Sequence, residues 1–135
     1  MKAAFETPIA DSDWAVRGSL SWSGTDGYID NLTSGGDVSD TNYLSGRSVI
    51  TGKIGDGTDI KIIADFTRDR SDGGLWYAPL PLAYDKKTEH DFSAENSVEA
   101  GGISVRLDHA FDSFDVTSIT AVRGHDMNQF LAGDF

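Results

Sequence analysis

The chain has no cysteine, only three prolines in 135 residues, and no long apolar run. The absence of cysteine excludes disulfides, thiolate metal sites and catalysis by a thiol. The absence of a run of about 20 apolar residues excludes a helical membrane protein. The length is sufficient for one domain with a core of its own.

Positive charge is also scarce, because 11 basic residues stand against 22 acidic ones and the formal net charge is −11. Such a chain is a poor partner for nucleic acid and for anionic membrane surfaces. The first six residues turn acidic before any apolar core begins, so we expect no secretory signal within this stretch of sequence. The patterned sequence starts and stops abruptly, so we expect the chain to be a piece of a longer one.

The most informative segment is residues 14–22, in which apolar and small polar side chains alternate strictly. Alternate side chains of a strand share one face, and here that face carries a tryptophan at each end. Aromatic rings favour the two lipid–water interfaces of a membrane. Eight steps of about 3.3 Å, tilted by about 40°, span about 20 Å, close to the apolar band of an outer-membrane barrel. We therefore predict Trp14 and Trp22 to be membrane-interface aromatics.

Similar alternation recurs along the chain, with short turns and long loops in turn between the strands. The predicted strands are residues 2–7, 14–22, 43–54, 59–69, 100–109 and 114–123, with long loops at 30–40 and 70–98 and a further loop from Gly124. We predict an all-β fold, an antiparallel up-and-down meander of about six strands that is part of a larger transmembrane β-barrel. A soluble sandwich with one solvated face also alternates.

Charges of both signs fall on the face opposite the apolar one, which favours a hydrated or plugged lumen over a dry core. The residues predicted to face inward are Arg17, Arg47, Lys53, Lys61, Asp65, Arg106, Asp108 and Arg123. The third strand fits less well, because Gly46, Ser48 and Gly52 would face lipid.

The candidate ligand site is an apolar, aromatic and proline-punctuated stretch at residues 73–84, inside the longest loop. A loop that only connects strands is usually polar, so this stretch indicates either ligand contact or packing among loops. For ligand contact, Trp76, Tyr77 and Tyr84 would stack on a flat or chelate-like ligand.

Catalytic and metal-binding patterns are weak throughout the sequence. The three histidines lack the spacing of metal ligands, and the acidic clusters lack the order of a calcium loop. No phosphate loop, nucleophile elbow or zinc-protease motif is present. The sequence therefore predicts no catalytic residue, no metal site and no cofactor, and a protein that is not an enzyme.

Several runs, taken in order, resemble the early barrel of TonB-dependent outer-membrane receptors, most of all those of the siderophore-uptake type. The runs are DGYIDN at 26–31 after the tryptophan-closed strand, LSGR at 44–47, IADFTRDRSD at 63–72, TSITAVR at 117–123 and DMNQFLAGDF at 126–135. The resemblance covers nearly the whole chain.

This resemblance implies a barrel of about 22 strands with a plugged lumen, in the outer membrane of a Gram-negative bacterium. It implies uptake of a ferric siderophore or a similar scarce ligand, driven by the TonB complex, with ligand contacts in the loops and the plug. Residues 1–135 would then be a partial barrel domain without its plug, in contact with outer-membrane lipid. The plug of the parent chain would contact TonB.

An alternative from a different class is a soluble β-sandwich or small barrel that binds carbohydrate or another small ligand. In that alternative Trp76 and Tyr77 form a stacking platform. The position of Trp14, Val16, Leu20 and Trp22 separates the two, since a packed interior favours the soluble module and an outer surface favours the membrane.

Overall fold

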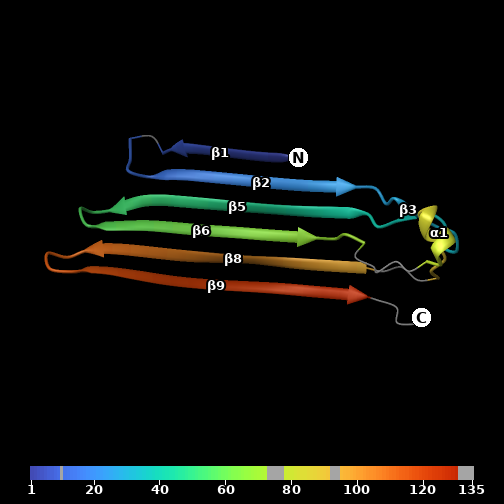
Figure 1. Cartoon of the computed structure of the whole chain (residues 1–135). Helices are drawn as coiled ribbons and strands as arrows, with labels where there is room; N and C mark the ends of the chain where they lie inside the picture. The colour runs from blue at the N-terminus through green and yellow to red at the C-terminus, as the bar shows by residue number, and fades with distance from the viewer. Residues whose placement is uncertain (10, 73–77, 92–94, 131–135) are drawn as a thin grey trace. The chain divides into compact units, whose positions relative to one another are not determined.

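The computed structural model describes residues 1–9, 11–72, 78–91 and 95–130, and it is all-β. Six strands form one antiparallel sheet in sequence order, as the alternating arrows of Figure 1 show. This meander confirms the predicted fold class at the level of the sheet. The strands are β1 (Lys2–Pro8), β2 (Ala15–Thr25), β5 (Thr41–Ile54), β6 (Thr58–Asp69), β8 (Glu95–Ala110) and β9 (Asp115–Phe130).

The last two strands are longer than their sequence pattern indicates. Strand β8 begins at Glu95, inside the predicted loop, and β9 continues to Phe130, so the loop predicted from Gly124 is wrong. Strands pair through backbone N–H and C=O groups, which polar residues carry as well as apolar ones. A strand therefore continues through a polar stretch when the adjacent strand is long enough to pair with it. Both strands have 16 residues.

The two long loops contain structure that the sequence analysis left unassigned. They hold β3 (Ile29–Asn31), β4 (Asp37–Val38), the short helix α1 (Leu80–Tyr84) and β7 (Lys87–Thr88). Strand β3 lies between β4, to which it is antiparallel, and β7, to which it is parallel. No helix in the described ranges has the length and apolar character needed to cross a membrane.

The chain divides into two compact units. The first comprises Met1–Ser21, Ser45–Thr67 and Ala100–His125, and the second comprises Trp22–Leu44, Arg68–Glu99 and Asp126–Phe135. The first unit contains the three short turns of the meander. The second contains the small sheet and α1, which packs against β7.

In the first unit the alternation produces two chemically distinct faces of the sheet. Phe5 of β1 is in register with Gly18 of β2, and Glu6 is in register with Arg17. Residues directly opposite each other share a face, so one face carries aromatic and apolar groups and the other carries charges. The two faces are those that the sequence predicts for residues 14–22.

The apolar face has no core packed against it within the described part of the chain. The fully buried side chains of the described residues are those of Asn31 and Thr88, both polar and both in the second unit. The accessible surface is 9673 Å², whereas a monomeric globular protein of 14.5 kDa exposes about 6,900 Å². The chain therefore exposes far more surface than its mass requires.

Candidate functional site

The two tryptophans predicted to mark the membrane interfaces lie just before strand β2 and within it. Trp14 immediately precedes β2 and is half-buried, whereas Trp22 lies within β2 and is 49% exposed. The Trp14 indole fills the space above Gly52 of β5, where a Cβ atom would overlap the ring. The Trp22 indole lies close to Gly24 of its own strand. Neither tryptophan is enclosed in a core.

Glycine on the apolar face is covered by aromatic rings from the adjacent strands. Phe5 lies over Gly18 and Phe66 lies over Gly46, in the same way that Trp14 lies over Gly52. A ring that covers a strand glycine restores apolar contact and shields the exposed backbone. Gly46 and Gly52, which fitted poorly with the predicted lipid-facing strand, are therefore positions where an aromatic ring covers the backbone on the apolar face.

Between these rings the apolar face of the first unit has an open groove of about 530 Å³. Its side walls include Phe5, Leu20 and Phe66, and its floor includes Gly18 and Gly46. The ring of Phe66 is 45% exposed and that of Phe5 60%. In a stable protein, a large patch of exposed apolar side chains is covered by lipid or by another apolar surface.

The opposite face of the first unit is organised by ion pairs, each of which includes at least one residue predicted to face inward. Arg123 of β9 forms two hydrogen bonds with the Asp65 carboxylate of β6, at 2.5 and 3.1 Å. It passes over Gly102 of β8, where a Cβ would lie 3.2 Å from the Arg123 Cγ. The other pairs of this face are Arg17–Glu6 at 3.9 Å, Lys53–Asp59 at 3.5 Å and Arg106–Asp108 at 2.7 Å, with Thr117 Oγ1 donating to Asp108.

In the second unit the two long loops are joined through Asn31. Its side-chain amide donates to the His90 carbonyl at 3.0 Å, and its side-chain oxygen accepts from the backbone N–H groups of Thr33 and Ser34. Asn31 is 1% exposed and Thr88 of β7 is fully buried. Strands β3, β4 and β7 with helix α1 thus form one folded element, which we name the loop cap.

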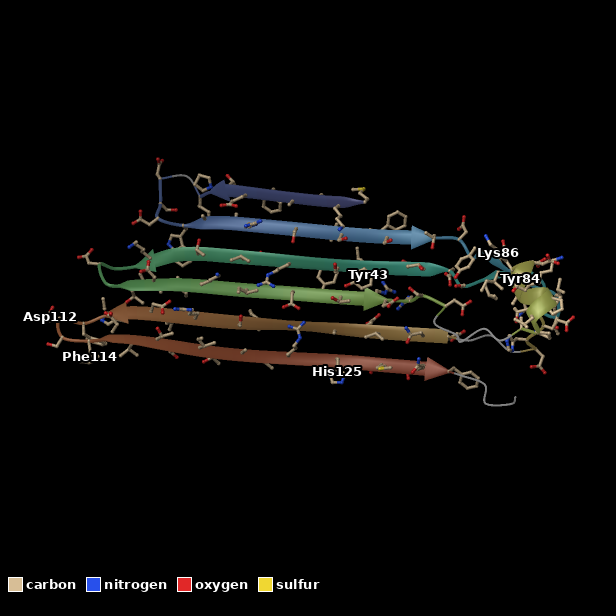
Figure 2. All side chains as sticks on the ribbon, in the orientation of Figure 1. Tyr43, Tyr84, Lys86, Asp112, Phe114 and His125 are labelled. Carbon is tan, nitrogen blue, oxygen red and sulfur yellow. The ribbon has the colours of Figure 1, made fainter. Side chains whose placement is uncertain are left out.

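Of the three predicted ligand contacts, Tyr84 falls within the described residues. Trp76 and Tyr77 lie outside the described residues. Tyr84 lies at the end of α1 and is 84% exposed, and Leu80 of the same helix is 72% exposed. Lys86 follows two residues after Tyr84 (Figure 2). The described part of the loop cap therefore presents Tyr84 to solvent and does not enclose it in a pocket.

A polar contact that the sequence analysis missed holds the base of the two loops together in the second unit. The Ser39 N–H donates to Asp72 Oδ2 at 3.0 Å, and the Asp72 N–H donates to Asp40 Oδ1 at 2.9 Å. Burial raises the pKa of the Asp72 carboxyl above its usual value, the Ser39 hydrogen bond opposes this, and the Asp40 charge adds to it. Asp72 Oδ1 is buried and has no hydrogen-bond partner among the described residues.

Asp40 and Asp72 border an open polar hollow of about 500 Å³ together with Arg70, Ser71 and Glu95. No signal in the sequence distinguished them from a solvated acidic loop. Among the described residues no group of three or more histidine, aspartate or glutamate side chains is arranged to hold a metal ion.

Comparison of the chain with known proteins gives no match to a family model, to a curated protein or to a solved structure.

Proposed function

We propose that this chain is a barrel segment of an outer-membrane active-transport receptor of the TonB-dependent type, from a Gram-negative bacterium. The parent receptor takes up a ferric siderophore or a similar scarce ligand with energy from the TonB complex, which contacts the plug of the parent chain. The segment itself supplies strands and loops and has no enzymatic role.

One observation carries the proposal, namely the unpacked apolar face of the sheet in the first unit. Phe5, Phe66 and Trp14 cover glycines on that face, and no described apolar side chain is fully buried. In water such a face is costly, at about 25 cal/mol for each Å² of exposed apolar surface, whereas hydrocarbon removes that cost. The opposite face carries paired charges, which suit a hydrated lumen.

The loop cap supports a ligand-contacting role for the long loops. Binding residues are often placed on loops that a rigid scaffold positions, and the buried Asn31 and Thr88 provide such a scaffold. We propose that Tyr84, with Trp76 and Tyr77, contacts the iron chelate. A Tyr84→Ala variant of the parent receptor is expected to bind ferric chelate more weakly, and unchanged binding would exclude the contact.

The alternative, a soluble sandwich or small barrel that binds a small ligand, has less support. A sandwich buries apolar side chains between two sheets. Of the four side chains that separate the two classes, Trp22 and Leu20 are instead 49% and 46% exposed. The other two, Trp14 and Val16, are half-buried.

The proposal is tested by measuring which sheet face enters the bilayer. All three native tryptophans are replaced by phenylalanine, and one tryptophan is introduced at Val105 on the apolar face or at its neighbour Ser104 on the polar face. The chain is refolded into phosphatidylcholine vesicles with brominated acyl chains. We expect strong quenching of the Val105→Trp variant and weak quenching of the Ser104→Trp variant, and equal quenching of the two would overturn the proposal.

The interface role of the tryptophans is measured in the same vesicles. Variants that retain only Trp14 or only Trp22 are compared with bromine placed near the headgroup or near the chain end. Bromine near the headgroup is expected to quench both more strongly, because indole rings favour the lipid–water interface.

A further inference from the structure

Two arginines of strand β6 share one carboxylate in the second unit. Arg68 Nε lies 3.3 Å from Glu99 Oε1, and Arg70 Nη2 donates to the same oxygen at 3.1 Å. The three side chains are each about half exposed to solvent. Two positive charges and one negative charge leave the cluster with an excess of one positive charge, in a chain whose formal net charge is −11.

This stoichiometry differs from that of the ion pairs in the first unit. Each described ion pair there joins one basic side chain to one carboxylate, as Arg17 does with Glu6. Glu99 is instead contacted by two guanidiniums through a single oxygen. Each guanidinium carries five N–H donors, so this oxygen uses only a small part of the donors that the cluster presents. The cluster is therefore able to bind a further anion.

Both arginines lie on the side of the sheet that carries Trp22. The Arg70 N–H donates to the Asn42 carbonyl at 2.9 Å. In the antiparallel pair of β5 and β6, Arg70 is therefore opposite Asn42, and Arg68 is opposite Leu44. Residues directly opposite each other share a face. Trp22, Asn42 and Leu44 line, together with the two arginines, an open hollow of about 190 Å³.

The side of the sheet that carries Trp22 is the side proposed to face lipid. Trp22 ends the apolar face of residues 14–22, and indole rings favour the lipid–water interface. Along β6 the even-numbered residues are apolar from Ile60 to Phe66, and the two arginines follow at the next two even positions. A strand that passes from hydrocarbon into the headgroup layer needs this change, because cationic side chains there meet lipid phosphates.

A phosphate group matches the donors around this hollow better than a carboxylate does. A phosphate monoester has three terminal oxygens and a charge of about −1.5 to −2, so it accepts from two guanidiniums at once. The hollow of about 190 Å³ is smaller than the pockets of about 300 to 1,000 Å³ that enclose a whole drug-sized molecule. One phosphate group therefore suits the hollow better than a whole iron chelate.

From these observations we propose that Arg68 and Arg70 bind the phosphate group of an anionic membrane lipid. The Trp22 ring and the Leu44 side chain contact the carbon atoms next to that phosphate, and Glu99 holds the two guanidiniums side by side. This site rests on the proposed function, because it requires the side of the sheet that carries Trp22 to face lipid.

The two arginines are expected to contribute unequally to the site. Arg70 also lines the polar hollow that Asp40 and Asp72 border, and these carboxylates oppose the approach of an anion. Arg68 is absent from the described lining of that hollow, and its contact with Glu99 is made through Nε. The phosphate is therefore held mainly by the guanidinium of Arg68.

The site is tested by titration in nonionic detergent, with Trp22 as the reporter. Trp14 and Trp76 are replaced by phenylalanine, and the full chain is titrated with dihexanoyl phosphatidic acid. We expect a saturable change in Trp22 fluorescence, weakened at least about tenfold by Arg68→Gln and about threefold by Arg70→Gln. The matched control is Arg17→Gln, which removes an arginine paired with a single carboxylate and should change the affinity less than about twofold.

The Glu99→Gln variant moves the affinity in the opposite direction and so separates binding from folding. Loss of the shared negative charge is expected to tighten binding of dihexanoyl phosphatidic acid at least about threefold. Dihexanoyl phosphatidylcholine has the same chains without the net charge, and inorganic phosphate has the charge without the chains. Each of these two probes is expected to bind at least about tenfold more weakly.

The proposal is overturned if Arg68→Gln binds dihexanoyl phosphatidic acid within twofold of the parent, or if Glu99→Gln does not bind it more tightly. It is also overturned if inorganic phosphate binds as tightly as the lipid, because the hollow is then a site for a free anion. The titration and the brominated vesicles report separate failures. Unequal quenching of Val105→Trp and Ser104→Trp with no effect of Arg68→Gln would remove the lipid site and leave the transport role in place.

Discussion

The indole ring of Trp14 occupies the space in which a side chain of Gly52 would stand. Trp14 precedes strand β2 and Gly52 lies near the end of β5, so the contact joins segments that are far apart in sequence. It fixes the position of the ring on the apolar face, and it gives Gly52 a role that no other residue type is able to fill without moving the ring.

Replacement of Gly52 by alanine is expected to destabilise the chain by about 1 to 3 kcal/mol, because the added methyl group displaces the Trp14 ring. Urea unfolding in detergent, followed by tryptophan fluorescence, measures the change. The matched control is Gly124→Ala, since a Cβ there has no atom within 4 Å. Equal losses of stability at Gly52 and Gly124 would contradict the conclusion that the Trp14 ring requires a glycine at position 52.

Replacement of Asn31 by alanine is expected to unfold the loop cap without unfolding the six-stranded sheet. The substitution leaves the backbone donors of Thr33 and Ser34 and the His90 carbonyl without their Asn31 partner. Each of these part-buried hydrogen bonds contributes about 1 kcal/mol. Hydrogen exchange should speed up in β3 and β7 and remain slow in β5. The exposed neighbour Asp30, changed to asparagine, is the control.

Asp72 is expected to make the second unit less stable as pH rises. Burial raises the pKa of its carboxyl in the folded chain above the ordinary 3.8. Between the pKa of the unfolded chain and the higher pKa of the folded chain, the folded chain binds more protons than the unfolded chain. The free energy of unfolding therefore falls as pH increases through this window. Urea unfolding of the parent and of Asp72→Asn, measured from about pH 3 to pH 7, should show this slope only in the parent.

The Asp72→Asn variant is also expected to be at least as stable as the parent at neutral pH, because its amide oxygen still accepts from the Ser39 N–H. Asp72→Ala loses this acceptor and should be less stable by about 1 kcal/mol. A variant series in which asparagine is the more damaging change would show that the charge itself stabilises the loops.

The Asp65–Arg123 pair is expected to show a larger coupling free energy than the Lys53–Asp59 pair. The first has two hydrogen bonds from one guanidinium, and the second is a single contact at 3.5 Å between well-exposed groups. Two double-mutant cycles with alanine, followed by urea unfolding, compare the pairs. Coupling indistinguishable from zero at Asp65–Arg123 would mean that its geometry contributes nothing to stability.

The strands of the meander were predictable because their signals are local. Two examples are the alternation at 14–22 and the short turn between the predicted strands 43–54 and 59–69, where the sequence is GDGT. Each signal acts over a few residues, and both predictions hold, in β2 and in the β5–β6 turn. The loop cap was not predictable in this way, because β3 and β7 are too short to have a pattern. Their pairing depends on Asn31 and His90, which are 59 residues apart.

The sequence by itself determined that the chain forms strands, which side chains share a face, and where the short turns lie, because period-two alternation and turn chemistry are properties of neighbouring residues. Only the tertiary structure decided which ring covers which glycine, that Arg123 reaches Asp65 across Gly102, and that the long loops fold together. These relationships depend on the register between distant strands, and that register is set by all the cross-strand pairs together.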